Sequence, residues 1–316
     1  MTNQTEAKSP SKLKSNIEKY SLYLFLVPAI VLVIIFNYLP ILGTVIAFKD
    51  YNIFAGDTPI NSIFASEWVG LKHFRRIFTN TEFVRAIRNT LLISTYKIVF
   101  LFPIPIFLAI MITDIKSLWY KKTIQTVLYL PHFLSWVVVT SIFIQILGPY
   151  GIINNWLKNN NIIGTSIQFF GNNNLFRSLL VVSAGWKEVG WNAIIYIAAI
   201  TGINPQLYEA AQIDGASKIQ QAVFITLPSI ASTIVLLFIL RIGAILDAGF
   251  DQIFNMYTTS VYDRGDILST LVYRVGLGQR EYSFGTAVGL FNSVIALIMV
   301  LGGNYLTRKT LDKGLW

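Results

Sequence analysis

NPQLYEAAQIDGASKIQQAVFITLP, residues 204–228, is the stretch of this sequence that decides the fold. Asn204 is a good helix N-cap, and Pro205 suits the first position of a helix. The pair Asp214-Gly215 then ends this helix, because glycine readily takes a positive φ. The stretch therefore begins with one short helix followed by a tight turn.

A second short helix is predicted directly after that turn. Ser217 can cap its beginning, and Pro228 is expected to stop it before the next apolar run. Side chains at helical spacing give each helix a small or apolar face: Leu207, Ala210 and Ala211 in the first, and Ile219, Val223 and Phe224 in the second. The periodicity alone predicts an amphipathic helical hairpin that lies on a membrane surface.

The composition around this hairpin indicates a membrane protein. Of the 316 residues, 54% are hydrophobic and only 13% are charged, whereas a soluble domain usually carries about 25% charged residues. A chain with so few charges cannot cover itself with a polar surface, so a lipid-facing exterior is expected. A single bundle of membrane helices fits the length better than two soluble domains.

The sequence also argues against several site chemistries. It contains no cysteine, which excludes disulfides and thiolate sites, and its two histidines, His73 and His132, are far apart, so no metal site is predicted. The net charge of +9 could suggest nucleic acid. However, the basic residues cluster beside apolar runs, as they do at the ends of membrane spans, so nucleic-acid binding is not expected.

The fold class predicted is an all-α polytopic membrane protein with six transmembrane helices. A span needs about 20 mainly apolar residues. Six runs meet this need, at about 22–48, 90–112, 124–147, 175–200, 230–250 and 284–306. The first run is too long for a signal peptide, and no A-x-A-like cleavage site follows it.

Orientation is predicted from the density of basic residues. With six spans, both termini share one side with the 113–123 and 201–229 loops. Counting Lys and Arg over all the loops does not decide between the two orientations. The short 113–123 loop and both tails are nevertheless dense in Lys and Arg, which favours the cytoplasm as their side.

Fixed positions within 204–228 resemble the coupling loop of ABC importer permeases. The pattern consists of Glu209-Ala210-Ala211, then Asp214-Gly215-Ala216, then Phe224, and finally Leu227-Pro228. Many positions at set distances make it more specific than a lone glycine motif. The resemblance covers almost the whole chain and is strongest to the LplB-like branch of the maltose-type, binding-protein-dependent permeases. It is carried by NYLPILGTVIAFKDYN (37–52), YLPHFLSWVVV (129–139), GWNAIIYIAAI (190–200) and GLW (314–316).

The resemblance implies a type I ABC importer permease fold in the bacterial cytoplasmic membrane, with both termini in the cytoplasm. It divides the chain into a cytoplasmic tail, residues 1–19, and one transmembrane permease domain, residues 20–316. Within that domain the core is about 85–306 and the coupling loop is 201–229. The solute it implies is a carbohydrate, most naturally an oligosaccharide.

The resemblance also implies partners. A second permease would complete the translocation path, two ATPase subunits would bind on the cytoplasmic side, and an extracellular lipoprotein would deliver the sugar. Glu209 would anchor the loop in a groove of one ATPase, Ala210 and Ala211 would allow close approach, and Gly215 would fix the bend. Asp214, Ala216, Phe224 and Pro228 complete the expected coupling residues.

No catalytic residue or cofactor is expected on this chain. The sequence lacks a G-x-x-x-x-G-K-[ST] phosphate loop, so ATP and Mg²⁺ are assigned to the partner ATPase.

Charged residues within or near the predicted spans leave two interpretations open. Lys97, Lys187, Glu188, Arg241 and Asp247 could line the translocation path, because intramembrane charges usually face a bundle interior or a cavity. They could equally pair structurally or extend to the interface. The structural interpretation is favoured for Lys97, and neither is favoured for the other four.

Aromatic and amide residues supply candidates for the sugar path. A pyranose presents apolar C–H faces and a polar rim, so aromatic rings and hydrogen-bonding groups suit it. With Glu188 and Asp247, the predicted path residues are Trp136, Gln145, Trp186, Trp191, Asn192 and Tyr196. Any one of these rings could instead belong to an interfacial aromatic belt. His132 follows Pro131 at an expected helix break and is assigned a structural hydrogen bond.

Three other classes of protein remain as alternatives, besides an ABC permease for a non-sugar solute. A secondary transporter often contains inverted repeats, but no second half of this chain matches the first. A membrane scaffold would need no ATPase-docking hairpin. A membrane enzyme would need paired carboxylates, a metal cluster or an activated nucleophile, and none is evident.

Overall fold

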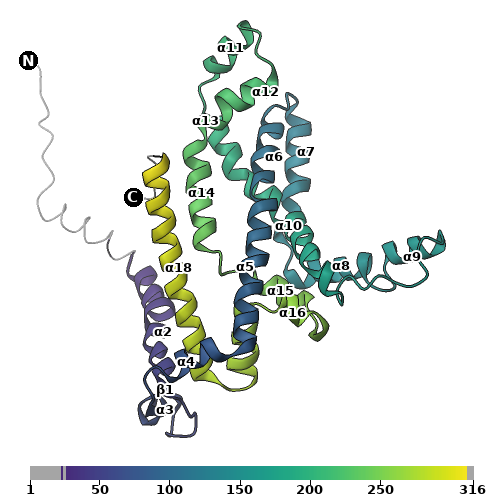
Figure 1. The fold of residues 1–316 in the computed structure, drawn as a ribbon. Helices are drawn as coiled ribbons and strands as arrows, with labels where there is room; N and C mark the ends of the chain where they lie inside the picture. Colours follow the sequence, from purple (N-terminus) through teal and green to yellow (C-terminus); the bar gives the residue numbers. More distant parts are fainter. Residues whose placement is uncertain (1–22, 24–25, 312–316) are drawn as a thin grey trace, which may run out of the picture. The chain divides into compact units, whose positions relative to one another are not determined.

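The computed structural model describes Tyr23 and residues 26–311, which belong to two compact units, Met1–Gly70 and Leu71–Trp316. The predicted tail, residues 1–19, lies outside the described residues. The described residues are mostly helical, as Figure 1 shows.

The first unit contains one apolar helix and a small pair of antiparallel strands. The helix, Leu26–Phe48, is long and apolar enough to span a membrane, as predicted. It continues through η1 (Ile34–Tyr38), α2 (Leu39–Leu42) and η2 (Gly43–Phe48). The π-helical turn η1 precedes Pro40, because proline cannot donate to the carbonyl four residues back and its ring crowds it.

Two short strands follow and depart from the all-α prediction. β1 (Lys49–Asp50) pairs antiparallel with β2 (Glu67–Trp68), so that Lys49 lies opposite Trp68. Between them lies α3 (Pro59–Ala65). The Lys49 ammonium donates to the carbonyls of Phe64 and Ser66, each at 3.1 Å, and this closes the loop on itself.

The second unit is a helical bundle. Its long elements are α5 (Thr81–Leu101), α6 (Pro103–Thr113), α7 (Leu118–Tyr129), α8 (Trp136–Leu147), α10 (Asn173–Thr201), α14 (Ala231–Gly243) and α18 (Tyr282–Leu311). Short elements connect them: α4 (Lys72–Thr79), η3 (Leu130–Phe133), α9 (Ile152–Asn159), α11 (Pro205–Ile213), α12 (Lys218–Gln221), η4 (Ala222–Thr226), α13 (Leu227–Ser229), α15 (Phe250–Met256), η5 (Thr259–Val261), α16 (Tyr262–Gly265), α17 (Leu268–Leu271) and η6 (Val272–Gly278).

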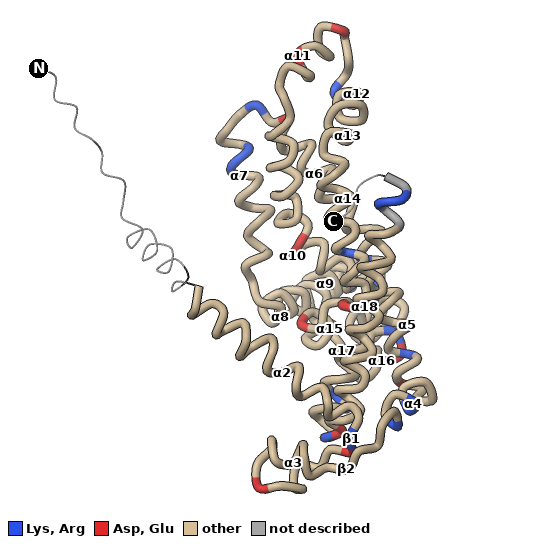
Figure 2. The backbone as a smooth tube through the Cα atoms, turned by 90° about the vertical axis from the view of Figure 1, so that its left-hand side faces the viewer, with Lys and Arg blue, Asp and Glu red and all other residues tan. Residues whose placement is uncertain are grey.

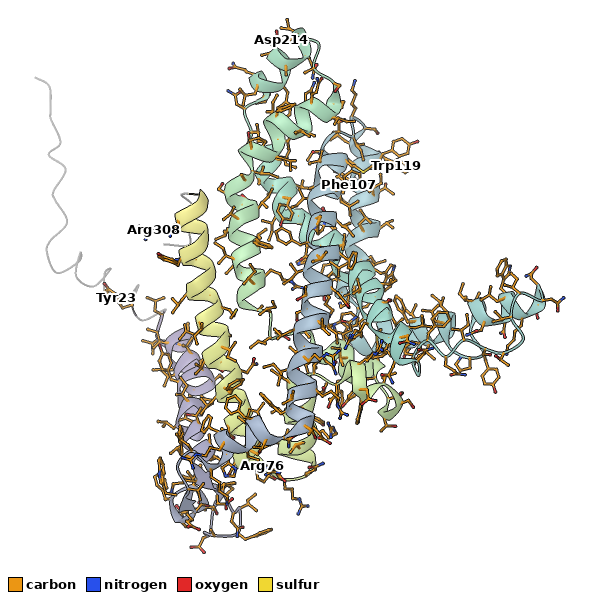
Figure 3. All side chains as sticks on the ribbon, viewed as in Figure 1. Tyr23, Arg76, Phe107, Trp119, Asp214 and Arg308 are labelled. Carbon is orange, nitrogen blue, oxygen red and sulfur yellow. The ribbon has the colours of Figure 1, made fainter. Side chains whose placement is uncertain are left out.

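The exterior of this bundle is apolar. Phe107 on α6 and Trp119 on α7 point outward and are 62% and 68% exposed (Figure 3). Figure 2 shows long stretches of α6 and α18 without a charged residue. An apolar surface of this extent would be unfavourable in water, so it agrees with the lipid-facing exterior predicted from composition.

The described residues do not confirm six spans. Four helices are long and apolar enough to cross a membrane: Leu26–Phe48, Thr81–Thr113, Trp136–Asn159 and Tyr282–Tyr305. A fifth is counted if Lys218–Ser229 and Ala231–Gly243, which meet at a bend of 65°, form one span. Three of the four agree with predicted runs at 22–48, 90–112 and 284–306.

The other predicted runs differ from the structure for identifiable reasons. The run 124–147 is not one helix, because Pro131 lies in the break η3 between α7 and α8. The run 175–200 is helical within α10, but Lys187 and Glu188 make its middle polar. The run 230–250 ends early, since α14 stops at Gly243 and a turn leads to Gly249, whose φ is +94°.

Two buried apolar clusters hold the bundle together. One joins α5, α8, α10 and α15 through side chains that include Ile93, Phe176 and Ile253. The other joins α6, α10 and Ile230, just before α14, through Ala109, Ala193 and Tyr196. Both include α10, which therefore forms the central axis of the second unit.

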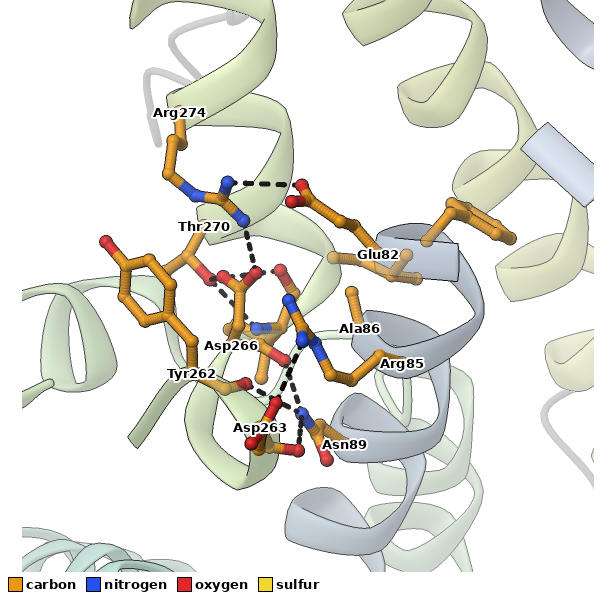
Figure 4. Close-up of polar contacts among 12 residues, drawn as sticks. Glu82, Arg85, Ala86, Asn89, Tyr262, Asp263, Asp266, Thr270 and Arg274 are labelled. Carbon is orange, nitrogen blue, oxygen red and sulfur yellow. Dashed lines mark hydrogen bonds and ion pairs between the residues drawn. The ribbon is translucent and has the colours of Figure 1, made fainter. Parts of the chain in front are cut away.

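A polar network fastens the connector between α15 and α18 to α5 (Figure 4). Arg274 pairs with Glu82 at 3.2 Å and with the fully buried Asp266 at 2.6 Å. The Asn89 amide donates to the carbonyl of Asp266 at 3.0 Å and to that of Asp263 at 3.1 Å. Because buried charges are costly unless paired, this network gives the connector one fixed position on α5.

Candidate functional site

The hairpin at 204–228 begins as the sequence predicts. The Asn204 side chain accepts a hydrogen bond from the backbone of Gln206 at 3.0 Å, and Pro205 opens α11. The helix ends at Asp214, and Gly215 follows with a φ of +78°. No atom lies within 4 Å of where a Cβ would stand on Gly215, so the backbone angle and not crowding requires glycine there.

The second helix is capped as predicted and ends close to where the sequence predicts. Ser217 and Gln220 exchange reciprocal hydrogen bonds between side chain and backbone at 2.7 and 3.3 Å, which is a capping box. The helix then passes through the π-helical turn η4 and α13 and ends at Ser229, one residue past Pro228 and before the next apolar run, as predicted. The bend of 65° falls at Ile230.

The hairpin presents its apolar side chains to solvent. Asp214 marks its tip in Figure 3. None of the residues of α11 is buried, and Ile213, Ile219 and Phe224 are 87%, 76% and 75% exposed. Glu209 is exposed, and it forms no ion pair with any residue that the structure describes. Apolar side chains exposed together, beside an unpaired carboxylate, are typical of a docking surface for another protein.

Internal contacts keep this hairpin rigid. The Tyr208 hydroxyl lies 2.9 Å from that of Thr226, which joins the two arms. The buried Gln221 donates to the carbonyl of Ala216 at 3.0 Å. Lys218 forms an ion pair with Asp114, in the loop between α6 and α7. That contact confirms that the 113–123 and 201–229 loops lie at the same end of the bundle.

The hairpin is joined almost directly to the central helix. α10 ends at Thr201, and α11 begins four residues later at Pro205. With 29 residues, α10 extends about 43 Å at 1.5 Å per residue. A displacement of the hairpin would therefore be carried along the axis of the bundle.

A cavity of about 250 Å³ lies between α5, α6, α10 and α14. Its polar lining consists of Lys97, Glu188, Asn192, Tyr196 and Arg241, and the rest is apolar: Leu101, Phe102, Pro105, Val189, Ile195, Leu237, Leu240 and Ala244. Glu188, Asn192 and Tyr196 are three of the residues predicted for a solute path, and their spacing of four residues places them along one face of α10. The structure thus brings these three together.

Lys97 has a structural role in this cavity wall, the interpretation favoured from sequence. Its side chain is 5% exposed, and its ammonium donates to the Ala248 carbonyl at 2.7 Å and to the Gln252 side chain. Gln252, fully buried, donates in turn to the Leu180 carbonyl and to Ser183. Gln252 was not predicted from the sequence. The signal that marks it is a glutamine that lies among apolar residues of a short helix.

Glu188 and Arg241 remain available to a solute. Both are half-buried, and within the described part of the chain neither forms an ion pair. Lys97 interacts electrostatically with Glu188, Arg241 and Asp247, so charges of both signs lie near one another here. A cavity lined by an amide, a carboxylate, a guanidinium and a phenol can hydrogen-bond to hydroxyl groups throughout its lining.

An adjacent face of α10 forms a different site, at the break between α7 and α8. Lys187 donates to the carbonyls of His132 and Leu134 at 2.6 and 2.7 Å, and its ammonium lies 5.6 Å from the Trp136 ring. His132 stacks on Trp191 with ring centroids 4.3 Å apart. Trp136 and Trp191 therefore stabilise the helix break. The structural hydrogen bond expected of the His132 side chain is not found at Nδ1, which is buried without a partner among the described residues; only the backbone carbonyl of His132 bonds to Lys187.

The remaining predicted path residues lie away from the cavity. Trp186 packs edge-on against Phe143 at 5.9 Å. Gln145 is exposed on α8. Asp247 is exposed in the turn after α14, where it accepts from the Gly249 backbone at 3.1 Å. Among the described residues, no group of three or more His, Asp and Glu side chains is placed to hold a metal.

Replacing Lys187 tests its role at the break. We expect Lys187→Met to lower the stability of the purified protein by about 1–3 kcal/mol, because two carbonyls lose charge-assisted donors. The measurement is the thermal unfolding midpoint in detergent. Lys122→Met, at an exposed site on α7, is the matched control and should leave the midpoint unchanged; equal midpoints for the two variants would contradict this role.

The chain belongs to the family of binding-protein-dependent transport system inner membrane components, which matches residues 102–309. Protein LplB of Bacillus subtilis is 40% identical over 296 residues, which cover 93% of this chain and 91% of that relative. The polygalacturonan/rhamnogalacturonan transport system permease protein YteP of the same organism is 41% identical over 300 residues, covering 95% and 91%.

A solved structure agrees with this assignment. It is that of a bacterial alginate ABC transporter in complex with an alginate pentasaccharide-bound periplasmic protein. One of its chains is 39% identical to this chain and superposes with a TM-score of 0.84, covering 97% of this chain and all of that one. The type I permease fold implied by the coupling-loop motif is thereby confirmed.

Proposed function

We propose that this chain is one of two permease subunits of an ATP-driven importer for an oligosaccharide. The observation that carries the proposal is the exposed hairpin, whose apolar side chains and unpaired Glu209 require a partner. Support for the solute class comes from the names of the relatives, which include a galacturonan permease and an alginate importer. The cavity on α10, with its polar lining, would form this subunit's half of the path.

In this proposal the energy comes from other chains. ATP and Mg²⁺ bind to two ATPase subunits, one of which receives the hairpin in a groove, with Glu209 as its ionic anchor. Movement of the ATPases is transmitted through α11 and α10 to the cavity, because packed elements move as units. An extracellular lipoprotein delivers the sugar, and both termini face the cytoplasm with the hairpin.

Purification of the tagged chain from its native membrane, followed by mass spectrometry, tests the assembly. We expect an ATPase, a second permease and a sugar-binding lipoprotein to co-purify. Recovery of the chain alone, even after crosslinking, would contradict the proposal and would favour a secondary transporter.

Substitutions in the cavity test the solute path. We expect Asn192→Ala and Glu188→Gln each to raise the KM for oligosaccharide uptake about three- to tenfold, because each removes one polar contact. Uptake is measured in proteoliposomes with the complete importer, and retention of the ATPase shows that assembly is intact. Gln145→Ala, outside the cavity, is the control. A KM in the cavity variants equal to that of the control would remove α10 from the path.

A further inference from the structure

Five aromatic rings lie in mutual contact around α15: Phe250, Phe254, Tyr257, Tyr262 and Tyr273, called here the aromatic cluster. Phe250 and Phe254 stack with centroids 5.2 Å apart, and Phe254 meets the Tyr273 ring at 4.8 Å. Tyr257 is 6.2 Å from Phe254 and 5.0 Å from Tyr262. These residues lie outside the candidate spans and outside the residues already assigned a function.

The aromatic cluster is not simply part of the core. Phe254 and Tyr273 are 38% and 43% exposed, whereas Ile253 and Met256 of the same helix are buried in the core. α15 thus has one face that packs inward and one that offers rings outward. Burial and then the neighbouring Tyr262 hydroxyl raise the pKa of Tyr257, so its phenol stays protonated and can donate a hydrogen bond.

Buried polar contacts hold the aromatic cluster in one position. Gln252 fixes α15 to α5 through Lys97 and to α10 through Leu180 and Ser183. Arg274, next to Tyr273, lies 4.9 Å from the Tyr262 ring while it pairs with Asp266. A surface ordered in advance loses little conformational entropy when it binds a ligand.

Two links connect α15, which carries two of the rings, to the cavity wall. Ala244 lines the cavity, and the turn that begins there leads in six residues to Phe250. Lys97 lines the same cavity and contacts α15 directly through Gln252. Within the second unit, α15 and the hairpin lie at opposite ends of α14 (Figure 1). A solute that reaches the cavity from the end opposite the hairpin would pass α15.

The cavity on this subunit is small for a long solute. Its volume of about 250 Å³ is below the usual range of about 300–1,000 Å³ for small-molecule sites, so an oligosaccharide that contacts this subunit there would extend beyond the cavity, toward the partner permease or along α15. Exposed carboxylates of Asp247 and Asp251 border the aromatic cluster in sequence. Rings that pack against C–H faces, together with carboxylates that accept from hydroxyls, match the two sides of a pyranose.

We infer that the aromatic cluster is an outer carbohydrate subsite, which holds pyranose units of an oligosaccharide while its leading end occupies the cavity. This inference rests on the function proposed above and adds to it a prediction about chain length. Loss of the subsite should weaken binding of long saccharides and leave the shortest ones unaffected, because only long saccharides reach both sites.

The test uses the complete importer in proteoliposomes, with alginate and galacturonate oligosaccharides of graded length as probes. We expect Phe254→Leu and Tyr273→Ala to raise the KM for the longest imported saccharide about three- to tenfold, with no change for the shortest. Phe254→Leu removes the ring but keeps an apolar side chain, and Tyr273→Phe, which keeps the ring, should behave as wild type. Tyr150→Ala removes an aromatic side chain that is 89% exposed elsewhere and is the control.

A second measurement uses the absence of cysteine from the chain. In a Phe254→Cys variant, an alginate pentasaccharide should slow labelling of this chain by a membrane-impermeant maleimide. The same saccharide should not slow labelling of a Tyr150→Cys variant.

Unchanged KM values at every length, or a rise in KM that is equal for short and long saccharides, would overturn the inference and leave the importer intact. Loss of a partner subunit from Phe254→Leu would make the aromatic cluster a protein interface. A wild-type importer that takes up no probe would overturn the proposed function and this inference together.

Discussion

The Glu209→Gln variant is expected to lose its partner ATPase during purification while remaining folded in the membrane. Glu209 is exposed on α11 and unpaired within the described residues, and it would become buried on docking. Removal of one member of a buried, hydrogen-bonded charge pair at an interface costs about 2–5 kcal/mol. The affinity for the ATPase should therefore fall at least about 30-fold, and transport should fall with it.

The measurement compares ATPase retention, sugar uptake and the unfolding midpoint of the variant with those of wild type. The glutamine keeps the size and most hydrogen bonds of the side chain, so the midpoint should not change. Asp57→Asn, which neutralises an exposed carboxylate in the first unit, is the control and should retain the ATPase. Normal retention by Glu209→Gln would show that the carboxylate is not the anchor.

The hairpin could be predicted from sequence because its signals are local. Asn204, Pro205 and Ser217 act on the next two or three residues, and Gly215 satisfies a backbone angle at its own position. The stop expected at Pro228 is found one residue later, since the helix ends at Ser229 and the chain bends before α14 begins.

The break within 124–147 depends on contacts that no local pattern reveals. Pro131 indicated a break, but the carbonyls of His132 and Leu134 within the break are satisfied by Lys187, more than 50 residues away in the sequence. The same contact between Lys187 and the helix break determines which residues of α10 face the cavity and which face the break. Glu188 and Asn192 face the cavity, whereas Trp191 stacks on His132. The composition of α10 predicted a polar path, but not which of its polar and aromatic residues would line it.

A close approach between two helices of the bundle gives the second large effect. α10 passes α7 at Gly190, and a Cβ there would clash with the backbone carbonyl of Leu128 and lie 2.9 Å from its Cβ. Backbone cannot move aside as a flexible side chain can. We therefore expect Gly190→Ala to push α10 away from α7 and to lower the stability by about 1–3 kcal/mol, which is a drop of several degrees in the unfolding midpoint of a protein this size.

Gly289→Ala is the matched control for this substitution. Gly289 also lies within a long helix, α18, but no atom lies within 4 Å of where its Cβ would stand. Alanine is the better helix former, so this change should be neutral or slightly stabilising. The unfolding midpoint should thus fall for Gly190→Ala and should rise slightly or stay unchanged for Gly289→Ala.

Since Gly190 lies between Lys187 and Asn192, Gly190→Ala should also displace the residues on both faces of α10 and reduce uptake. A Gly190→Ala protein as stable as Gly289→Ala would mean that α10 and α7 are not in close contact there.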